Sequence, residues 1–231
     1  MPLLQGCHKG LAVLVDPDKI GENTQVLLGQ MEQCPPSMVL LGGSTSVSVP
    51  DSLVDRLHAM VSCPVVLFPG NASQFSPKAD ALFFLSLISG RNPEWLIGQQ
   101  VKAAQVVKAS GIEVVPVGYM LVESGGCTAV QRVSQTQPIA RDAVDIAVST
   151  ALAGELLGMQ AIYLEAGSGA RLSVPTVMVR AVKQALDIPL IVGGGLRSRK
   201  EVEQVWEAGA DLVVVGNALE TNPQLYRELL R

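Results

Sequence analysis

The chain has 231 residues, of which 48% are hydrophobic, and a formal net charge of -4 from 17 basic and 21 acidic side chains. This length suffices for a domain with a full core, whereas an acidic chain without a Lys/Arg cluster lacks the footprint that nucleic-acid binding requires. No apolar run reaches the roughly 18 residues of a membrane span, and the first residues lack the pattern of a signal peptide. We therefore expect a cytoplasmic protein without a membrane span, whose oily composition suits peripheral contact with a membrane or an apolar ligand and favours a homo-oligomer.

Apolar runs of strand length alternate with amphipathic segments along the chain, which is typical of βα units around a parallel sheet. The expected strands span residues 11–15, 38–41, 64–68, 81–85, 113–121, 161–165, 190–192 and 212–215. The main expected helices span residues 22–33, 51–60, 93–109, 141–157, 198–208 and 222–230.

The connection between the third and fourth strands departs from this alternation. Residues 69–77 are few and rich in helix breakers, so the third crossover helix is missing or replaced by a short covering segment. Eight strands without a break in composition predict a single domain over residues 1–231, a modified (β/α)8 TIM barrel. The alternative is an open doubly wound sheet, but no G-x-G-x-x-G fingerprint follows the first strand.

Cysteine and histidine show no recognisable site pattern. Cys7, Cys34, Cys63 and Cys127 lie far apart without metal-ligand spacing, so we expect them to be reduced and structural. The two histidines show no partner pattern either. Acid–base chemistry therefore falls to carboxylates or tyrosines.

Three successive strands near the C-terminus each end in glycine. The strand over 161–165 ends in Glu165 and opens into Gly167-Ser168-Gly169, the next is followed by Gly193 to Gly195, and the last by Gly216-Asn217. Glycine lets a backbone approach an anion closely and leaves its N–H groups free to bind it. Because the carboxyl ends of barrel strands meet on one face, these turns predict a phosphate site with Glu165 beside it.

Asp16 closes the first strand and precedes Pro17, so it is either a turn-forming residue or a metal ligand. Mg²⁺ needs few protein oxygens because water and phosphate supply the others. Ser44, after the neighbouring strand, offers the hydroxyl of a Mg²⁺ site.

Aromatic residues near strand ends leave two interpretations open. Tyr119 and Tyr163 either pack in the core or donate a hydrogen bond to a ligand, because a buried tyrosine hydroxyl needs a partner. Around the short third connection, the aromatic residues either pack in the core and between subunits or line an apolar groove. They are Phe68, Phe75, Phe83, Phe84 and Trp95.

Taken together, these motifs resemble the geranylgeranylglyceryl phosphate synthases and their bacterial heptaprenyl relatives. The resemblance covers nearly the whole chain, and its more specific parts are Tyr-Leu-Glu-Ala-Gly-Ser-Gly at 163–169 and Thr-Ala-Leu-Ala-Gly-Glu at 150–155. The other matching segments are residues 15–19, 42–44, 134–139, 193–195 and 216–217.

The resemblance implies a Mg²⁺-dependent prenyltransferase that joins a polyprenyl diphosphate, expected to be geranylgeranyl diphosphate, to the hydroxyl of sn-glycerol 1-phosphate. It assigns Mg²⁺ to Asp16 and Ser44, and the orientation or deprotonation of the attacking hydroxyl to Glu165. Together with Tyr163 and Tyr119, Glu165 forms the candidate catalytic set. The residues implied to bind glycerol phosphate are Tyr163, Leu164, Glu165, Ala166, Gly167, Ser168, Gly169, Gly194, Gly195, Gly216 and Asn217.

Two positions depart from the pattern of this family. Leu14 stands where some branches carry a lysine, and Gln135 stands where relatives often have asparagine. Two other functions stay open on the residues alone, an isomerase or lyase acting on a sugar phosphate and a carrier that binds prenyl phosphates without turnover. The isomerase or lyase would need a lysine or paired carboxylates at the strand ends, and the carrier has no use for a glycerol phosphate site.

Overall fold

The computed structural model describes residues 3–4, 8–43, 46 and 48–230. Eight parallel strands close into a barrel in chain order, with β8 pairing to β1. The strands are β1 (Gly10–Val15), β2 (Met38–Leu41), β3 (Val65–Leu67), β4 (Ala81–Leu87), β5 (Glu113–Leu121), β6 (Ala161–Glu165), β7 (Leu190–Gly193) and β8 (Leu212–Val215). The expected (β/α)8 barrel is therefore confirmed, and the open doubly wound sheet is wrong.

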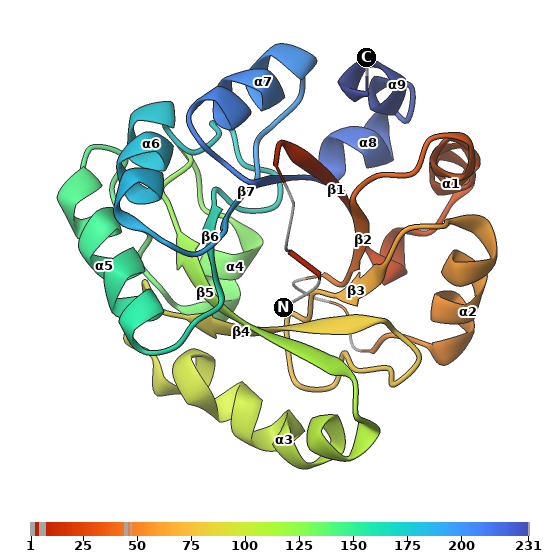
Figure 1. Ribbon diagram of the computed structural model, residues 1–231, viewed down its shortest axis with the longest axis horizontal. Helices are drawn as coiled ribbons and strands as arrows, with labels where there is room; N and C mark the ends of the chain where they lie inside the picture. Colours follow the sequence, from red (N-terminus) through yellow and green to blue (C-terminus); the bar gives the residue numbers. More distant parts are fainter. Residues whose placement is uncertain (1–2, 5–7, 44–45, 47, 231) are drawn as a thin grey trace.

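Helices surround this barrel on the outside, as Figure 1 shows in a view along its axis. The long helices are α1 (Glu22–Gln33), α2 (Asp51–Met60), α3 (Gln99–Ser110), α5 (Val144–Leu156), α6 (Thr176–Ala185) and α7 (Arg199–Glu207). Shorter ones are η1 (Pro17–Lys19), η2 (Glu94–Gly98), α4 (Ala129–Ser134), α8 (Asn217–Thr221) and α9 (Leu225–Leu229). In the part of the chain that the structure describes, no helix is long and apolar enough to cross a membrane.

Strand residues alternate between two packed layers because successive side chains point to opposite faces. Leu40, Phe83 and Tyr163 point into the barrel and belong to the inner cluster. Val39 and Leu164 point outward and pack beneath the helices. The interior is therefore filled with side chains, and the space for a ligand lies at the carboxyl ends of the strands.

The third crossover carries no helix, as its sequence predicted. Residues 68–80 run between β3 and β4 as turns and coil. Gln74 in this segment is only 1% exposed, and its side chain binds the backbone of the loop after β2. A buried amide thus replaces part of the packing that a helix supplies in the other units.

Two helix predictions need correction. Of the helix expected over 222–230, only α9 (Leu225–Leu229) forms, because Pro223 has no N–H to join it to α8, which precedes this range and was not predicted. The helix expected from residue 141 begins at Val144, because residues 141–142 form a turn that the Ala143 N–H closes on the Ala140 carbonyl oxygen (3.0 Å). Helix α4 was not predicted.

Candidate functional site

Glu165 is the last residue of β6 and lies buried at the mouth of the barrel, with 6% of its surface exposed. One of its carboxylate oxygens accepts a hydrogen bond from the backbone N–H of Gly167. Burial raises the pKa of Glu165 to about 7, against the lowering effects of that N–H and of the nearby Tyr163 hydroxyl. A carboxyl group with a pKa in this range can accept and return a proton near neutral pH.

Gly194 lies directly opposite Glu165 and must be glycine. Its φ of +84° belongs to the left-handed region, and a Cβ atom there would lie 2.3 Å from the Glu165 carboxylate and 2.7 Å from the Gly167 nitrogen. The loops after β6 and β7 therefore approach each other backbone to backbone. The glycines of both loops line the cavity, and glycine-rich backbone of this kind suits a small anion.

Side chains tie together the three loops that follow β6, β7 and β8. The Ser168 hydroxyl donates to the Asn217 side chain over 2.9 Å, which joins the loop after β6 to the start of α8. Arg197, after β7, donates through its guanidinium to the carbonyl oxygens of Ala170 and Arg171. The three loops of the predicted phosphate site thus hold one another in place.

Below Glu165, the aromatic rings of β5 and β6 stack inside the barrel. Tyr119 and Tyr163 are register partners with ring centroids 5.3 Å apart, and Phe68 stacks on Tyr163 at 5.2 Å. The Tyr163 hydroxyl is buried and finds no hydrogen-bond partner among the described residues. Burial, followed by the nearby Glu165 charge, raises the pKa values of both tyrosines, so both hydroxyls keep their protons.

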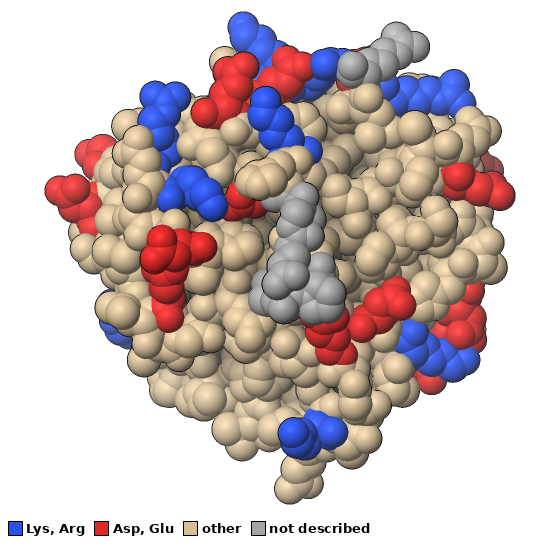
Figure 2. All heavy atoms as spheres, viewed as in Figure 1, with Lys and Arg blue, Asp and Glu red and all other residues tan. Residues whose placement is uncertain are grey.

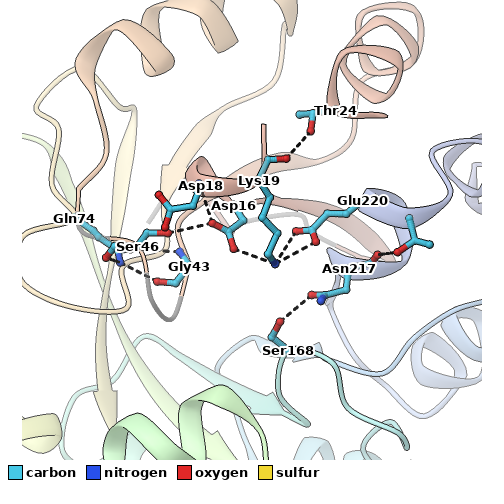
Figure 3. Close-up of polar contacts among 11 residues, drawn as sticks. Asp16, Asp18, Lys19, Thr24, Gly43, Ser46, Gln74, Ser168, Asn217 and Glu220 are labelled. Carbon is cyan, nitrogen blue, oxygen red and sulfur yellow. Dashed lines mark hydrogen bonds and ion pairs between the residues drawn. The ribbon is translucent and has the colours of Figure 1, made fainter. Parts of the chain in front are cut away.

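Asp16 lies across the mouth from Glu165, at the end of β1. Its Oδ1 accepts from the backbone N–H of Asp18 (3.1 Å) and from the Ser46 hydroxyl (3.0 Å), and its Oδ2 lies 3.1 Å from the Lys19 ammonium. Asp16 therefore forms the turn through Oδ1 and still presents Oδ2 to a cation. Figure 3 shows this carboxylate at the centre of a row of polar contacts.

Asp16 offers one carboxylate to a cation that would share its other ligands with a substrate. Among the described residues, no three His, Cys, Asp or Glu side chains form a cluster that could hold a metal by themselves. Any Mg²⁺ at Asp16 would hence take most of its ligands from water and phosphate oxygens, which it prefers. Ser44, the other predicted ligand, lies outside the described residues.

A single cavity of about 440 Å³ connects these elements. At one end it is lined by the glycine-rich loops, Glu165 and Asp16. At the other end it runs outside the barrel as an apolar groove between the third connection, β4 and α3. The groove is lined by Phe75, Leu82, Phe84, Trp95, Ala103 and Val107.

The groove decides between the two interpretations of the aromatic residues. Phe75, Phe84 and Trp95 line it, and Phe68 lines the cavity near Tyr163. Phe83 instead is fully buried inside the barrel. The apolar groove lies where a third helix would otherwise pack, as the sequence suggested for most of this set.

The two departures from the family pattern lie at different distances from the site. Leu14 lines the cavity next to Gly216 and gives it no charge. Gln135 ends α4 with a φ of +54°, in a region that asparagine tolerates better than most non-glycine residues. Gln135 thus lies in the β5–β6 connection and does not line the cavity.

Sequence reasoning placed the glycine turns, Glu165, Tyr163, Tyr119 and Asp16 around one cavity, and the structure brings them together there. Leu164 and Ala166, also predicted to bind glycerol phosphate, instead point outward and pack beneath the helices. It missed three participants, which are Lys19, Gln74 and Glu220. Only Lys19 had a local signal, since it follows Asp16 by three residues on the same short turn. The other two come from segments far away in the chain.

The fold and the site define a (β/α)8-barrel protein with glycine-rich loops after β6, β7 and β8 that line one cavity together with an apolar groove. The model of the PcrB family matches residues 8–231, and the chain belongs to this family.

Its relatives include the geranylgeranylglyceryl phosphate synthases of Flavobacterium johnsoniae and Spirosoma linguale. The first is 49% identical over 95% of this chain and 91% of the relative, and the second is 45% identical over 96% and 90%. A crystal structure of (S)-3-O-geranylgeranylglyceryl phosphate synthase from Thermoplasma acidophilum, in complex with its substrate sn-glycerol-1-phosphate, superimposes with a TM-score of 0.89. It is 35% identical, and the match covers 98% of this chain and 93% of that one.

Proposed function

We propose that this protein is a prenyltransferase that joins a polyprenyl diphosphate, expected to be geranylgeranyl diphosphate, to the hydroxyl of sn-glycerol 1-phosphate. The observation that carries the proposal is the single cavity in which a glycine-lined anion site and a buried carboxylate open onto an apolar groove. A sugar-phosphate isomerase needs the first two features but has no use for the groove. The relatives named above support the same reaction.

The acceptor, glycerol phosphate, fits the end of the cavity at the three loops. Its phosphate would lie against the backbone of Gly194, Gly195 and Gly216, with Ser168 and Asn217 beside it. The glycerol hydroxyls would then face Glu165 and Tyr163. This arrangement holds the attacking oxygen at a fixed position, which removes most of the entropy cost of bringing the substrates together.

The prenyl diphosphate would lie with its chain in the apolar groove and its diphosphate near Asp16. A carbon–oxygen bond forms between the glycerol oxygen and the first prenyl carbon, while the bond from that carbon to the diphosphate breaks. Glu165 takes the proton of the attacking hydroxyl, and the electron pair of the broken bond leaves with the diphosphate. The aromatic rings around Phe68 face the positive charge that develops on the allylic carbon.

We further propose that the reaction depends on Mg²⁺ held by Asp16 and, as the family resemblance implies, by Ser44. When bound, the ion offsets the negative charge that builds up on the leaving diphosphate. The protein's own part is to hold the carboxylate: Ser46 and the Asp18 N–H occupy Oδ1 and turn Oδ2 toward the cavity.

The exposed apolar residues at the surface of α5 support an assembly of identical subunits. Leu156 is 85% exposed and Leu157 78% exposed, and Ile146 is exposed on the same helix. Large apolar side chains at such exposure are typical of an interface. Light scattering coupled to size-exclusion chromatography tests this, and a monomer at micromolar concentration would contradict it.

The reaction is tested with purified protein, Mg²⁺, labelled sn-glycerol 1-phosphate and prenyl diphosphates of increasing length. We expect a prenylglyceryl phosphate that disappears with EDTA and returns with excess Mg²⁺. An absence of product at every chain length, with glycerol phosphate still bound, would contradict the transferase and leave only the anion site.

A further inference from the structure

Lys19 connects two carboxylates that come from opposite ends of the chain. Its ammonium lies 3.1 Å from Asp16 Oδ2, and 3.2 and 3.4 Å from the two carboxylate oxygens of Glu220. Lys19 belongs to η1 after β1, whereas Glu220 belongs to α8 after β8, and these strands are neighbours in the closed barrel. Figure 3 shows the lysine side chain reaching between both carboxylates at the mouth.

The ammonium occupies the position beside Asp16 that a metal ion would need. Asp16 Oδ1 already accepts two hydrogen bonds, so Oδ2 is the oxygen that can face a cation, and Lys19 is the cation that lies against it. Lys19 and a divalent ion therefore compete for one oxygen. Glu220 offers the ammonium a second partner and holds it in the same place.

All three residues line the cavity at the end where the diphosphate would lie. Asp16 and Glu220 bring two negative charges there and Lys19 one positive charge, while Leu14 on β1 brings none. A diphosphate adds further negative charge. Lys19 has a long, flexible side chain that is 46% exposed, so its ammonium can turn from the carboxylates toward a phosphate oxygen.

We propose that Lys19 binds the diphosphate of the prenyl substrate, and that Glu220 shares the ammonium with Asp16 until that substrate arrives. The proposal rests on the proposed transferase function and adds a substrate-binding residue and its positioning partner. It requires that loss of the lysine charge affect the metal and the diphosphate in opposite directions. If Lys19 only supported the loop, its replacement would weaken the binding of both the metal and the diphosphate.

The first measurement uses the protein without turnover. Sites for glycerol phosphate are saturated with sn-glycerol 1-phosphate, so that pyrophosphate cannot bind there. Binding of Mn²⁺ alone is followed by electron paramagnetic resonance, and binding of pyrophosphate in excess Mg²⁺ is followed by calorimetry. We expect K19Q to bind Mn²⁺ about fivefold more tightly, because an ion pair of this exposure opposes the metal by that order.

Pyrophosphate should show the reverse effect in the same variant. We expect K19Q to bind it about tenfold more weakly, since a charge-assisted hydrogen bond to a phosphate oxygen is lost. K19R keeps the charge and serves as the matched control. Its pyrophosphate affinity should stay within about threefold of the wild type, because a guanidinium also binds phosphate.

The E220Q substitution is made both in the wild type and in K19Q, because removal of the Glu220 charge also acts on the metal through space. E220Q frees Lys19 to pair with Asp16 alone, so Mn²⁺ should bind more weakly than in the wild type. The double variant K19Q/E220Q measures the through-space effect by itself. We expect the change in Mn²⁺ affinity caused by E220Q to be about half as large, or smaller, in the K19Q background as in the wild type.

Two outcomes overturn the inference. In the first, the affinity of K19Q for pyrophosphate stays within about twofold of the wild-type value. In the second, K19Q binds both Mn²⁺ and pyrophosphate more weakly than the wild type. If the wild type makes the ether product while these shifts are absent, only the inference fails. If the shifts appear and no prenyl diphosphate yields product, only the proposed transferase function fails.

Discussion

The side chain of Gln74 pairs with the backbone of Gly43 in both directions. Its amide nitrogen donates to the Gly43 carbonyl oxygen (2.8 Å), and its amide oxygen accepts from the Gly43 N–H (3.3 Å). The same amide nitrogen donates to the Ser46 carbonyl oxygen (2.6 Å), and the Ser46 hydroxyl in turn binds Asp16. The segment that replaces the third helix thus fixes the loop that supports Asp16, as Figure 3 shows.

Replacement of Gln74 by alanine should therefore lower stability and weaken the Asp16 side of the site. We expect a loss of about 2–4 kcal/mol in the free energy of unfolding, because buried backbone groups lose their partners. In steady-state kinetics, KM for the prenyl diphosphate should rise more than KM for glycerol phosphate. Gln105 is exposed on α3, and Q105A should change stability by less than about 0.5 kcal/mol in the same urea titration.

We expect the hydroxyl of Tyr163 to lower the free energy of unfolding and to contribute to the reaction. Because this buried group lacks a partner among the described residues, Y163F should keep or raise the free energy of unfolding, by up to about 1 kcal/mol, and yet slow product formation. Y226F is the control, since the Tyr226 hydroxyl donates to the Cys34 carbonyl oxygen over 2.6 Å, away from the cavity. It should lose about 1 kcal/mol. Equal losses in both variants would mean that the Tyr163 hydroxyl is paired.

Glu165 should make the reaction and the stability depend on pH in opposite ways. Its pKa in the folded protein, about 7, lies above its value in an unfolded chain, about 4.3, so the folded state binds more protons between these values. Stability should fall as pH rises from about 4.3 to 7, by an order of 3 kcal/mol, whereas the rate should rise as the carboxylate forms.

The variant E165Q separates these two effects. It should remove most of the fall in stability over that pH range and reduce kcat by about a hundredfold or more, because no base remains at this position. Urea titrations at several pH values and a pH–rate profile provide the measurements. A wild-type rate that is flat between pH 5 and 8, the range in which such a group titrates, would contradict the assigned base.

Residues at or directly after the ends of strands could be placed at the site from the sequence. Surface charge gave no such guide, because acidic and basic side chains are interspersed over the face in Figure 2, in keeping with the net charge of -4. The glycine turns follow strands directly and Glu165 ends one, so strand order and the closure of the barrel were enough to bring them together. Asp16 was found in the same way, from its place at the end of β1.

Glu220 and Gln74 reach the site only through the three-dimensional path of the chain. Glu220 meets Lys19 because β8 closes onto β1, and Gln74 meets Gly43 because a helix-free connection folds inward. Neither residue lies at a strand end, and neither belongs to a motif that chemistry alone would select. The short helices α4 and α8 escaped prediction for a similar reason, since five or six residues carry too little periodicity to be recognised.

The depth of the apolar groove should set the length of the prenyl chain that the protein accepts. Ala103 is 8% exposed on α3 and lines the groove with only a methyl group. In A103F, a phenyl ring would occupy space that a long chain needs, because the neighbouring groove walls are packed side chains with little freedom to move. We expect kcat/KM for the longest accepted diphosphate to fall at least tenfold, roughly, while that for shorter ones changes little.

The control for A103F is V101F on the same helix, where Val101 is 66% exposed and points away from the groove. It should leave the order of preference among prenyl diphosphates as in the wild type. Competition between a short and a long diphosphate in one reaction, with the products separated by chromatography, gives the ratio directly and cancels any loss of folded protein. An unchanged ratio in A103F would place the prenyl chain outside this groove, since a substrate lying along Ala103 cannot keep its length when the ring is present.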